Sequence, residues 1–187
     1  MEWLEDRKIP VGDWSEAAVD WLKDNARGFF DTLSDTLEWM IDGIVWLLSA
    51  PPSWVIVLIF VVITWGLQRS WKVCLLVALC LLFIINQGYW DDMIKTLALI
   101  IAAAVVCMSV GVPLGIAAAH NPRFSAFLRP VLDLMQTIPT FVYLIPALML
   151  FGLGKVPALF ATIVYAVPPV IRLTNVGIRE VSPSVVE

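Results

Sequence analysis

Charge is scarce in this sequence, and so are histidine and cysteine. Only 15% of the 187 residues are charged and 60% are hydrophobic, whereas soluble domains are about 25% charged and about 45–50% apolar. This shortage excludes a disordered chain and an ordinary soluble enzyme, and it indicates an integral membrane protein. The three cysteines, Cys74, Cys80 and Cys107, lie inside apolar runs and form no CxxC pair. Three such cysteines exclude a disulfide-rich module. We expect them to pack as small apolar residues in membrane helices and not to bind a metal.

Signatures of phosphate binding and catalysis are lacking as well. Gly154 and Lys155 resemble the end of a Walker A motif, but its first glycine would fall at Met149. The lone His120 has no nucleophile near it in the sequence, and the basic residues do not cluster as in nucleic-acid binders. The sequence therefore predicts no catalytic residue, no metal, no cofactor and no nucleic-acid partner. Any energy must come from a partner or an ion gradient.

The charges that are present divide the chain into an acidic front and a basic remainder. Residues 1–50 hold eleven acidic and four basic residues, and residues 51–187 hold five acidic and eight basic ones. Residues 13–48 predict one long amphipathic helix, because apolar residues recur there at steps of three and four. This stripe consists of Leu22, Ala26, Phe29, Leu33, Leu37, Met40, Ile44 and Leu47.

Two interpretations of this helix stay open. It lies in the membrane interface with its apolar face down, or it packs as a seam on another helix or on the membrane body. Helices that lie in an interface are usually rich in Lys and Arg, whereas this one is acidic. We favour the interfacial interpretation and treat residues 1–50 as an acidic, non-cytoplasmic segment.

Five apolar segments follow and predict an all-α polytopic membrane protein. Residues 54–67 and 73–85 form a tight hairpin within residues 51–92, although each is shorter than the roughly 20 residues that span a bilayer. Residues 93–119, 127–150 and 156–171 supply three further spans within a domain over 93–187. Gly111, Pro113 and Gly115 predict a kink or a close helix contact in the first of these three. Residues 172–187 are expected to be a polar tail.

Basic residues predict the orientation of these spans. With five spans the loops alternate sides, and six basic residues fall on one side against two on the other. The richer side is cytoplasmic by the positive-inside rule, which places the N-terminus outside and the residues after Arg172 in the cytoplasm. The six are Arg69, Lys72, Arg123, Arg129, Arg172 and Arg179, and the two are Lys95 and Lys155.

Polar residues in the middle of segment 127–150 are candidates for a transport pathway. Asp133, Gln136, Thr137 and Thr140 stand at i, i+3, i+4 and i+7, so one continuous helix would present them on one face. Pro139 removes a backbone hydrogen bond there, and Tyr143 offers a ring that can contact a cation. Polar groups in hydrocarbon face either a water-filled path or another helix. Both alternatives, pathway lining and interhelical contact, stay open.

Two stretches of the sequence resemble a known family. They are MQTIPTFVYLIPALMLFG at 135–152 and YAVPPVIRLTNVGI at 165–178, the most specific parts of a resemblance that covers residues 95–187. Both resemble the permease subunits of ABC importers for quaternary amines, the glycine betaine, proline betaine and choline group. The resemblance implies a type I (MetI-like) ABC importer permease bundle that is partial, with an amphipathic helix in front of it.

The resemblance also implies partners that the chain does not contain. A permease of this kind pairs with a second permease copy, with two ATP-binding subunits that hydrolyse ATP, and with a substrate-binding protein outside. A cytoplasmic helix with an EAA…G pattern couples it to the ATPase. Glu187 would be the first residue of that pattern, so the permease is expected to be truncated at its coupling loop. The implied coupling residues are Arg172, Thr174, Gly177, Arg179 and Glu187.

Three functions follow, in order of preference. The first is a non-enzymatic permease subunit in the cytoplasmic (inner) membrane that passes glycine betaine, choline or a related quaternary amine inward. The second is a membrane anchor or assembly subunit that docks a partner and transports nothing. The third is a gradient-driven carrier, for which Asp133 is the one intramembrane acid available.

Overall fold

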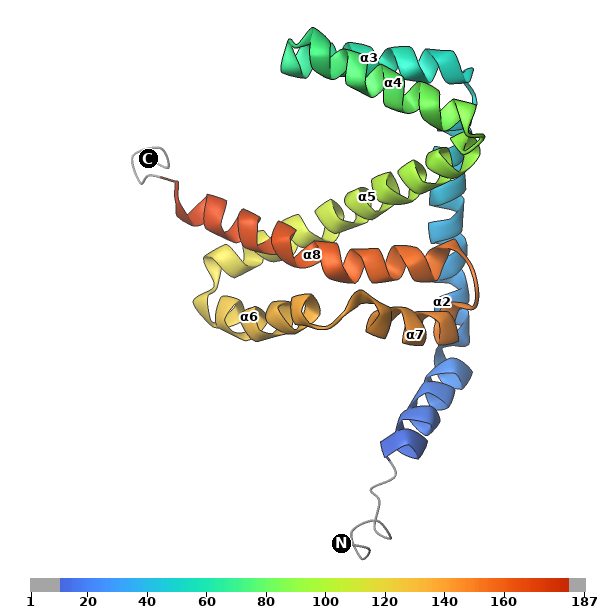
Figure 1. Ribbon diagram of the computed structural model, residues 1–187. Helices are drawn as coiled ribbons and strands as arrows, with labels where there is room; N and C mark the ends of the chain where they lie inside the picture. Colours follow the sequence, from blue (N-terminus) through green and yellow to red (C-terminus); the bar gives the residue numbers. More distant parts are fainter. Residues whose placement is uncertain (1–10, 182–187) are drawn as a thin grey trace, which may run out of the picture.

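Residues 11–181 are described by the computed structural model in Figure 1, and throughout that range all regular structure is helical. This confirms the all-α prediction for the described residues. The helices are α2 (Val11–Ser49), α3 (Ser53–Gln68), α4 (Trp71–Asn86), α5 (Trp90–His120), α6 (Pro122–Thr137), α7 (Thr140–Phe151) and α8 (Lys155–Arg179).

The helix ends lie where the sequence supplies terminators. Helix α2 ends at Ser49, just before Pro51 and Pro52, because two consecutive prolines remove two backbone donors and crowd the preceding turn. Helix α3 ends in Arg69, whose φ of 50° places it in the left-handed region. Helix α6 begins after Asn121, whose side-chain oxygen accepts from the backbone N–H groups of the second and third residues that follow it.

A bundle of roughly aligned helices forms the body of the molecule, and α2 runs across one end of it (Figure 1). Helix α8 packs mainly against α5, and α7 packs against α8. Helices α3 and α4 form the predicted hairpin beside them. The core has two parts, one of Ile41, Ala102, Ala103 and Leu159 where α2 crosses, and one of Cys107, Leu132, Val167 and Ile171 farther along.

Two of the described helices, α5 and α8, are by themselves long and apolar enough to cross a membrane. The number rises to four if each bent helix pair, α2 with α3 and α6 with α7, counts as one crossing. Helices α3 and α4 have 16 residues each, below the length of about 20 that a straight span needs. The count of five spans therefore stays a prediction.

The predicted helix over 127–150 is wrong, because it is broken in the middle. Helix α6 ends at Thr137, α7 begins at Thr140, and the two are bent by 93°. Ile138 and Pro139 between them are extended, with ψ of 129° and 139°. The physical reason is that a proline excludes the α conformation at the residue before it and removes one donor. The predicted polar tail also differs, since α8 continues as helix to Arg179.

The face of α2 that packs on the bundle is rotated from the predicted stripe. Leu37, Met40 and Ile44 do pack against the core, but Phe29 and Leu47 are 65% and 63% exposed. Ile41, outside the stripe, is 1% exposed and lies at the centre of the contact. The apolar surface of α2 is wider than the stripe, so only the neighbouring helices decide which part of it is covered.

Helix α2 contacts α5, α7 and α8, which supports packing on the membrane body. The Phe30 ring meets the Phe151 ring edge-on at 5.5 Å, and Lys155 forms an ion pair with Asp42. Four tryptophans point away from this contact and are exposed, namely Trp14, Trp21, Trp39 and Trp46. An interfacial location is compatible with such an aromatic face and stays a prediction.

Candidate functional site

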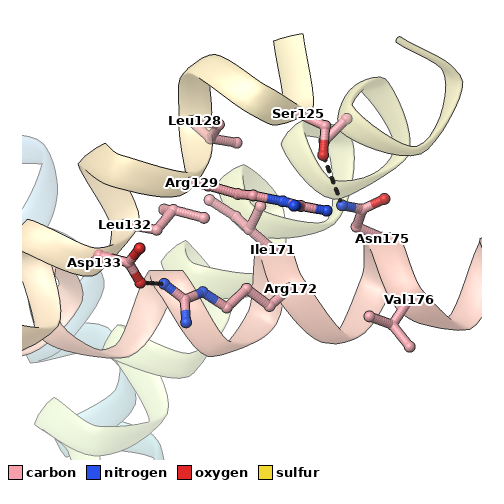
Figure 2. A pocket seen from close by; sticks show the side chains of 10 residues that line it. Ser125, Leu128, Arg129, Leu132, Asp133, Ile171, Arg172, Asn175 and Val176 are labelled. Atoms are coloured by element: carbon pink, nitrogen blue, oxygen red, sulfur yellow. Dashed lines mark hydrogen bonds and ion pairs between the residues drawn. The ribbon is translucent and has the colours of Figure 1, made fainter. Parts of the chain in front are cut away.

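A polar cluster joins the ends of α6 and α8 next to the end of α5 (Figure 2). Arg172 donates to the Asp133 carboxylate at 2.5 Å, and the Asn175 amide donates to the Ser125 hydroxyl at 3.3 Å. Ser125 is buried. The four residues of these contacts line a cavity of about 350 Å³. The space between the helices is therefore bordered by polar groups and is not filled by side chains.

The cluster carries a net positive charge. The lining residues include two arginines, Arg129 and Arg172, and one acid, Asp133. Figure 2 shows Arg172 at Asp133 and the Arg129 side chain extending toward Asn175. The carbonyl oxygen of the Asn175 side chain is buried and accepts no hydrogen bond, which costs about 1–3 kcal/mol when water is excluded. Arg172 and Asp133 remain partly exposed, so their pairing contributes at most about 1 kcal/mol.

Four of the five predicted coupling residues, Arg172, Thr174, Gly177 and Arg179, lie on α8 and not in a loop. Arg179 donates to the Ala118 carbonyl of α5 at 3.0 Å, and Thr174 packs where α5 has Gly115. Gly177 has open space around its Cα, and Glu187 lies outside the described residues. The contacts of Arg172, Thr174 and Arg179 tie the end of α8 to both α5 and α6. Movement of that end must therefore displace its two neighbours.

The two glycines of α5 mark a close helix contact. A Cβ at Gly111 would come within 2.8 Å of the Val170 side chain, and one at Gly115 within 2.5 Å of Thr174 and 2.9 Å of the Ile171 carbonyl. Helix α5 continues through Pro113 up to His120. Of the two predicted alternatives, the structure thus shows close approach at the glycines.

The predicted pathway residues do not share one face, because the break between α6 and α7 separates them. The Leu134 carbonyl accepts from Thr137 and from Tyr143, each at 3.2 Å, so these two hydroxyls hold the break together. Gln136 is half-buried at the end of α6. Thr140 begins α7 and lines a separate cavity between α7 and α8. The face predicted from the i, i+3, i+4, i+7 spacing is therefore wrong.

Sequence reasoning missed Ser125 and Asn175. They are 50 residues apart, and no spacing rule connects them. The polar character of Asn175 was visible in the sequence, but its partner depends on how α6 packs on α8. Within residues 11–181, no group of three His, Cys, Asp or Glu side chains could hold a metal ion.

The comparisons with known proteins match part of the chain to a family. Residues 111–187 match the family described as the inner membrane component of binding-protein-dependent transport systems. The matched residues include the polar cluster, the α6–α7 break and the glycine contact.

Named relatives extend the match over nearly the whole chain. The glycine betaine/carnitine transport permease protein of Listeria monocytogenes is 37% identical over 182 residues, which is 96% of this chain and 64% of the relative. The glycine betaine transport system permease protein of Bacillus subtilis is 38% identical over 180 residues, 96% of this chain and 64% of its own. The glycine betaine/proline betaine permease protein of Escherichia coli is 38% identical over 180 residues, 96% of this chain and 50% of its own.

These matches confirm the resemblance to quaternary-amine permeases. The matched regions also cover the acidic N-terminal segment and the α3–α4 hairpin. These parts lie outside residues 95–187, where the resemblance was seen in the sequence. The chain spans between half and about two thirds of the length of these relatives.

Proposed function

We propose that this protein is the permease of an ATP-driven importer that passes a quaternary amine inward across the cytoplasmic membrane. The observation that carries the proposal is 37–38% identity over 96% of the chain to permease proteins named for glycine betaine, carnitine and proline betaine. The helical fold and the family match over 111–187 support it. Choline is a further candidate substrate, since a choline transport permease protein matches over a shorter stretch.

The partners follow from this proposal. Two ATP-binding subunits hydrolyse ATP at the cytoplasmic face, a substrate-binding protein delivers the amine from outside, and a second permease copy completes the transporter. Helix α8 carries the coupling, because its end is tied to α5 by Arg179 and to α6 by Arg172. The resemblance makes Glu187 the first residue of the coupling pattern.

The transport pathway runs past the break between α6 and α7. Broken helices at membrane depth are tolerated where they line a cavity or are buried in protein. Gln136, Thr137, Thr140 and Tyr143 surround this break, and Pro139 creates it. Thr137 and Tyr143 hold its geometry through the Leu134 carbonyl, and Thr140 faces the neighbouring cavity.

The orientation that we propose has α2 outside and the end of α8 in the cytoplasm. Figure 1 shows the α3–α4 turn, the end of α5 and the end of α8 on one side of the bundle, and α2 on the other. The first side holds the basic turn around Arg69 and Lys72, and the second holds the exposed acids of α2. This separation supports the positive-inside assignment.

A cysteine in place of Asp35 should test this orientation. Asp35 is exposed on α2, so in a variant without native cysteines an impermeant maleimide should label it in intact cells. A cysteine in place of Arg179 should be labelled only after lysis. The reverse pattern at the two positions would invert the proposed topology.

Uptake of labelled glycine betaine tests the function itself. The protein is reconstituted in proteoliposomes with the ATP-binding and substrate-binding proteins of the same genome. We expect uptake only when ATP is present on the side of the membrane that carries the ATP-binding subunits. Inactivating those subunits should lower the rate of uptake at least tenfold. Uptake without ATP would contradict an ABC importer, and no uptake of glycine betaine, carnitine or choline would favour the anchor function.

A further inference from the structure

The cavity between α7 and α8 is distinct from the polar cluster and has an unusual lining. It measures about 310 Å³, and Thr140 and Phe141 line it from α7 while Thr162 and Tyr165 line it from α8. Ala158 and Ala161 also line it, and their methyl side chains leave room between the two helices. The lining thus combines two aromatic rings and three hydroxyls with Leu144 and three alanines.

The aromatic rings of this cavity are open to a ligand. Phe141 is 75% exposed and Tyr165 51% exposed, so the described part of the chain does not cover them. Thr162 donates its own hydroxyl proton to the Ala158 carbonyl at 2.8 Å. No carboxylate, ammonium, guanidinium or imidazole lines the cavity, so its affinity for a charged ligand must come from the ring faces.

A quaternary ammonium group fits such a lining. It carries a permanent charge but has no N–H to donate, so it gains little from hydrogen-bond acceptors and is attracted by aromatic faces within about 6 Å. A carboxylate in the membrane would bind the cation tightly and hinder its release, whereas transport requires binding that is easily reversed. Neutral aromatic rings attract the cation and still allow it to be released.

The position of the cavity suits a passing substrate. Thr140 is the first residue of α7, directly after the break, and Ala158 to Tyr165 lie in the half of α8 that begins at Lys155. In the proposed orientation that half is the outer one, where a substrate released outside enters. Tyr143, the ring considered from the sequence, is not part of this lining and bonds to the Leu134 carbonyl.

We propose that Phe141 and Tyr165 form a transient contact site for the trimethylammonium group of the transported amine. This inference rests on the proposed function and specifies which rings receive the substrate inside the permease. The remainder of the substrate, a carboxylate or a hydroxyl, lies toward the hydroxyl of Thr140.

Binding of choline to the purified protein in nanodiscs, without the substrate-binding protein, tests the site. Saturation-transfer NMR reports contact of the choline methyl groups with the protein, and 3,3-dimethyl-1-butanol is its uncharged analogue of the same shape. Loss of one ring should weaken binding about fivefold to thirtyfold, so F141L and Y165L should do so. Tyr165→Phe, which keeps the ring, should stay within about twofold of the unmodified protein.

Phe127→Leu is the matched control, because Phe127 is an exposed aromatic residue on α6 outside this cavity. It should bind choline as the unmodified protein does. Unchanged binding in both F141L and Y165L, with unchanged elution in size exclusion, would overturn the site. Equal binding of 3,3-dimethyl-1-butanol would overturn it as well and indicate an apolar groove for lipid or the second permease copy.

The two proposals fail in different ways. Uptake of glycine betaine by the assembled transporter without choline binding at these rings would refute the contact site and leave the import function standing. Absence of uptake for every quaternary amine would refute the import function.

Discussion

Gly115→Leu is expected to separate α5 from α8 and to prevent the protein from reaching its folded state. A Cβ at this position would stand 2.5 Å from Cβ of Thr174 and 2.9 Å from the Ile171 carbonyl oxygen. The carbonyl belongs to the α8 backbone, so a side-chain rotation cannot relieve the contact. The two helices must move apart, and they form the largest helix–helix contact of the described chain.

The smaller Gly115→Ala change allows this cost to be measured. Overpacking a close contact costs about 1–3 kcal/mol, although alanine by itself favours a helix by about 1 kcal/mol over glycine. We therefore expect a net loss of up to about 2 kcal/mol for G115A, after that gain is deducted. Denaturation in mixed micelles, followed by circular dichroism, gives the free energy of unfolding.

Gly66 provides the matched control for this experiment. It lies within α3, and a Cβ there would meet nothing within 4 Å. Gly66→Ala should leave stability unchanged or raise it by up to about 1 kcal/mol. If G115A proved as stable as G66A, the close contact between α5 and α8 would be refuted.

Ile41→Ala is expected to weaken the attachment of α2 to the bundle more than any truncation on the predicted stripe. Ile41 is 1% exposed and packs with Ala102, Ala103 and Leu159. Removing a buried isoleucine side chain typically costs about 2–5 kcal/mol through lost burial and the cavity left behind. The alanines opposite are too small to fill that cavity, so we expect a value of about 3 kcal/mol.

Leu47→Ala tests whether the packed face of α2 is the one in the structure or the predicted apolar stripe. Leu47 belongs to the predicted apolar stripe but is 63% exposed, so its truncation should cost less than about 1 kcal/mol. Hydrogen exchange along α2, measured with the stability of each variant, shows whether the helix detaches. Equal losses in I41A and L47A would restore the predicted stripe as the packed face.

Local signals in the sequence predicted the helices and most of their ends. Prolines 51 and 52 end α2, as predicted, through the backbone of their own residues. Asn121 and Pro122 start α6, ahead of the predicted start of that segment at residue 127. The break at Pro139 was foreseen as a missing hydrogen bond and not as a bend of 93°. A proline specifies that a helix is interrupted, but the packing of α6 and α7 against α8 sets the angle.

The candidate sites were less predictable. Gln136, Thr137, Thr140 and Tyr143 were grouped by assuming one continuous helix, and the break distributes them over two. Thr140 lines a cavity whose other wall comes from Tyr165 on α8. Contacts between residues 25 or 50 positions apart follow from the relative placement of helices, on which residue spacing carries no information.

The sequence by itself determined the class of protein, the acidic front, the likeness to quaternary-amine permeases and the ends of α2 to α5 to within a few residues. These depend on composition and on local backbone chemistry. Only the tertiary structure decided that α2 packs through Ile41, that Asp133 pairs with Arg172, and that Phe141 and Tyr165 share a cavity. An apolar helix offers several faces of similar hydrophobicity, and the neighbours that it meets choose among them.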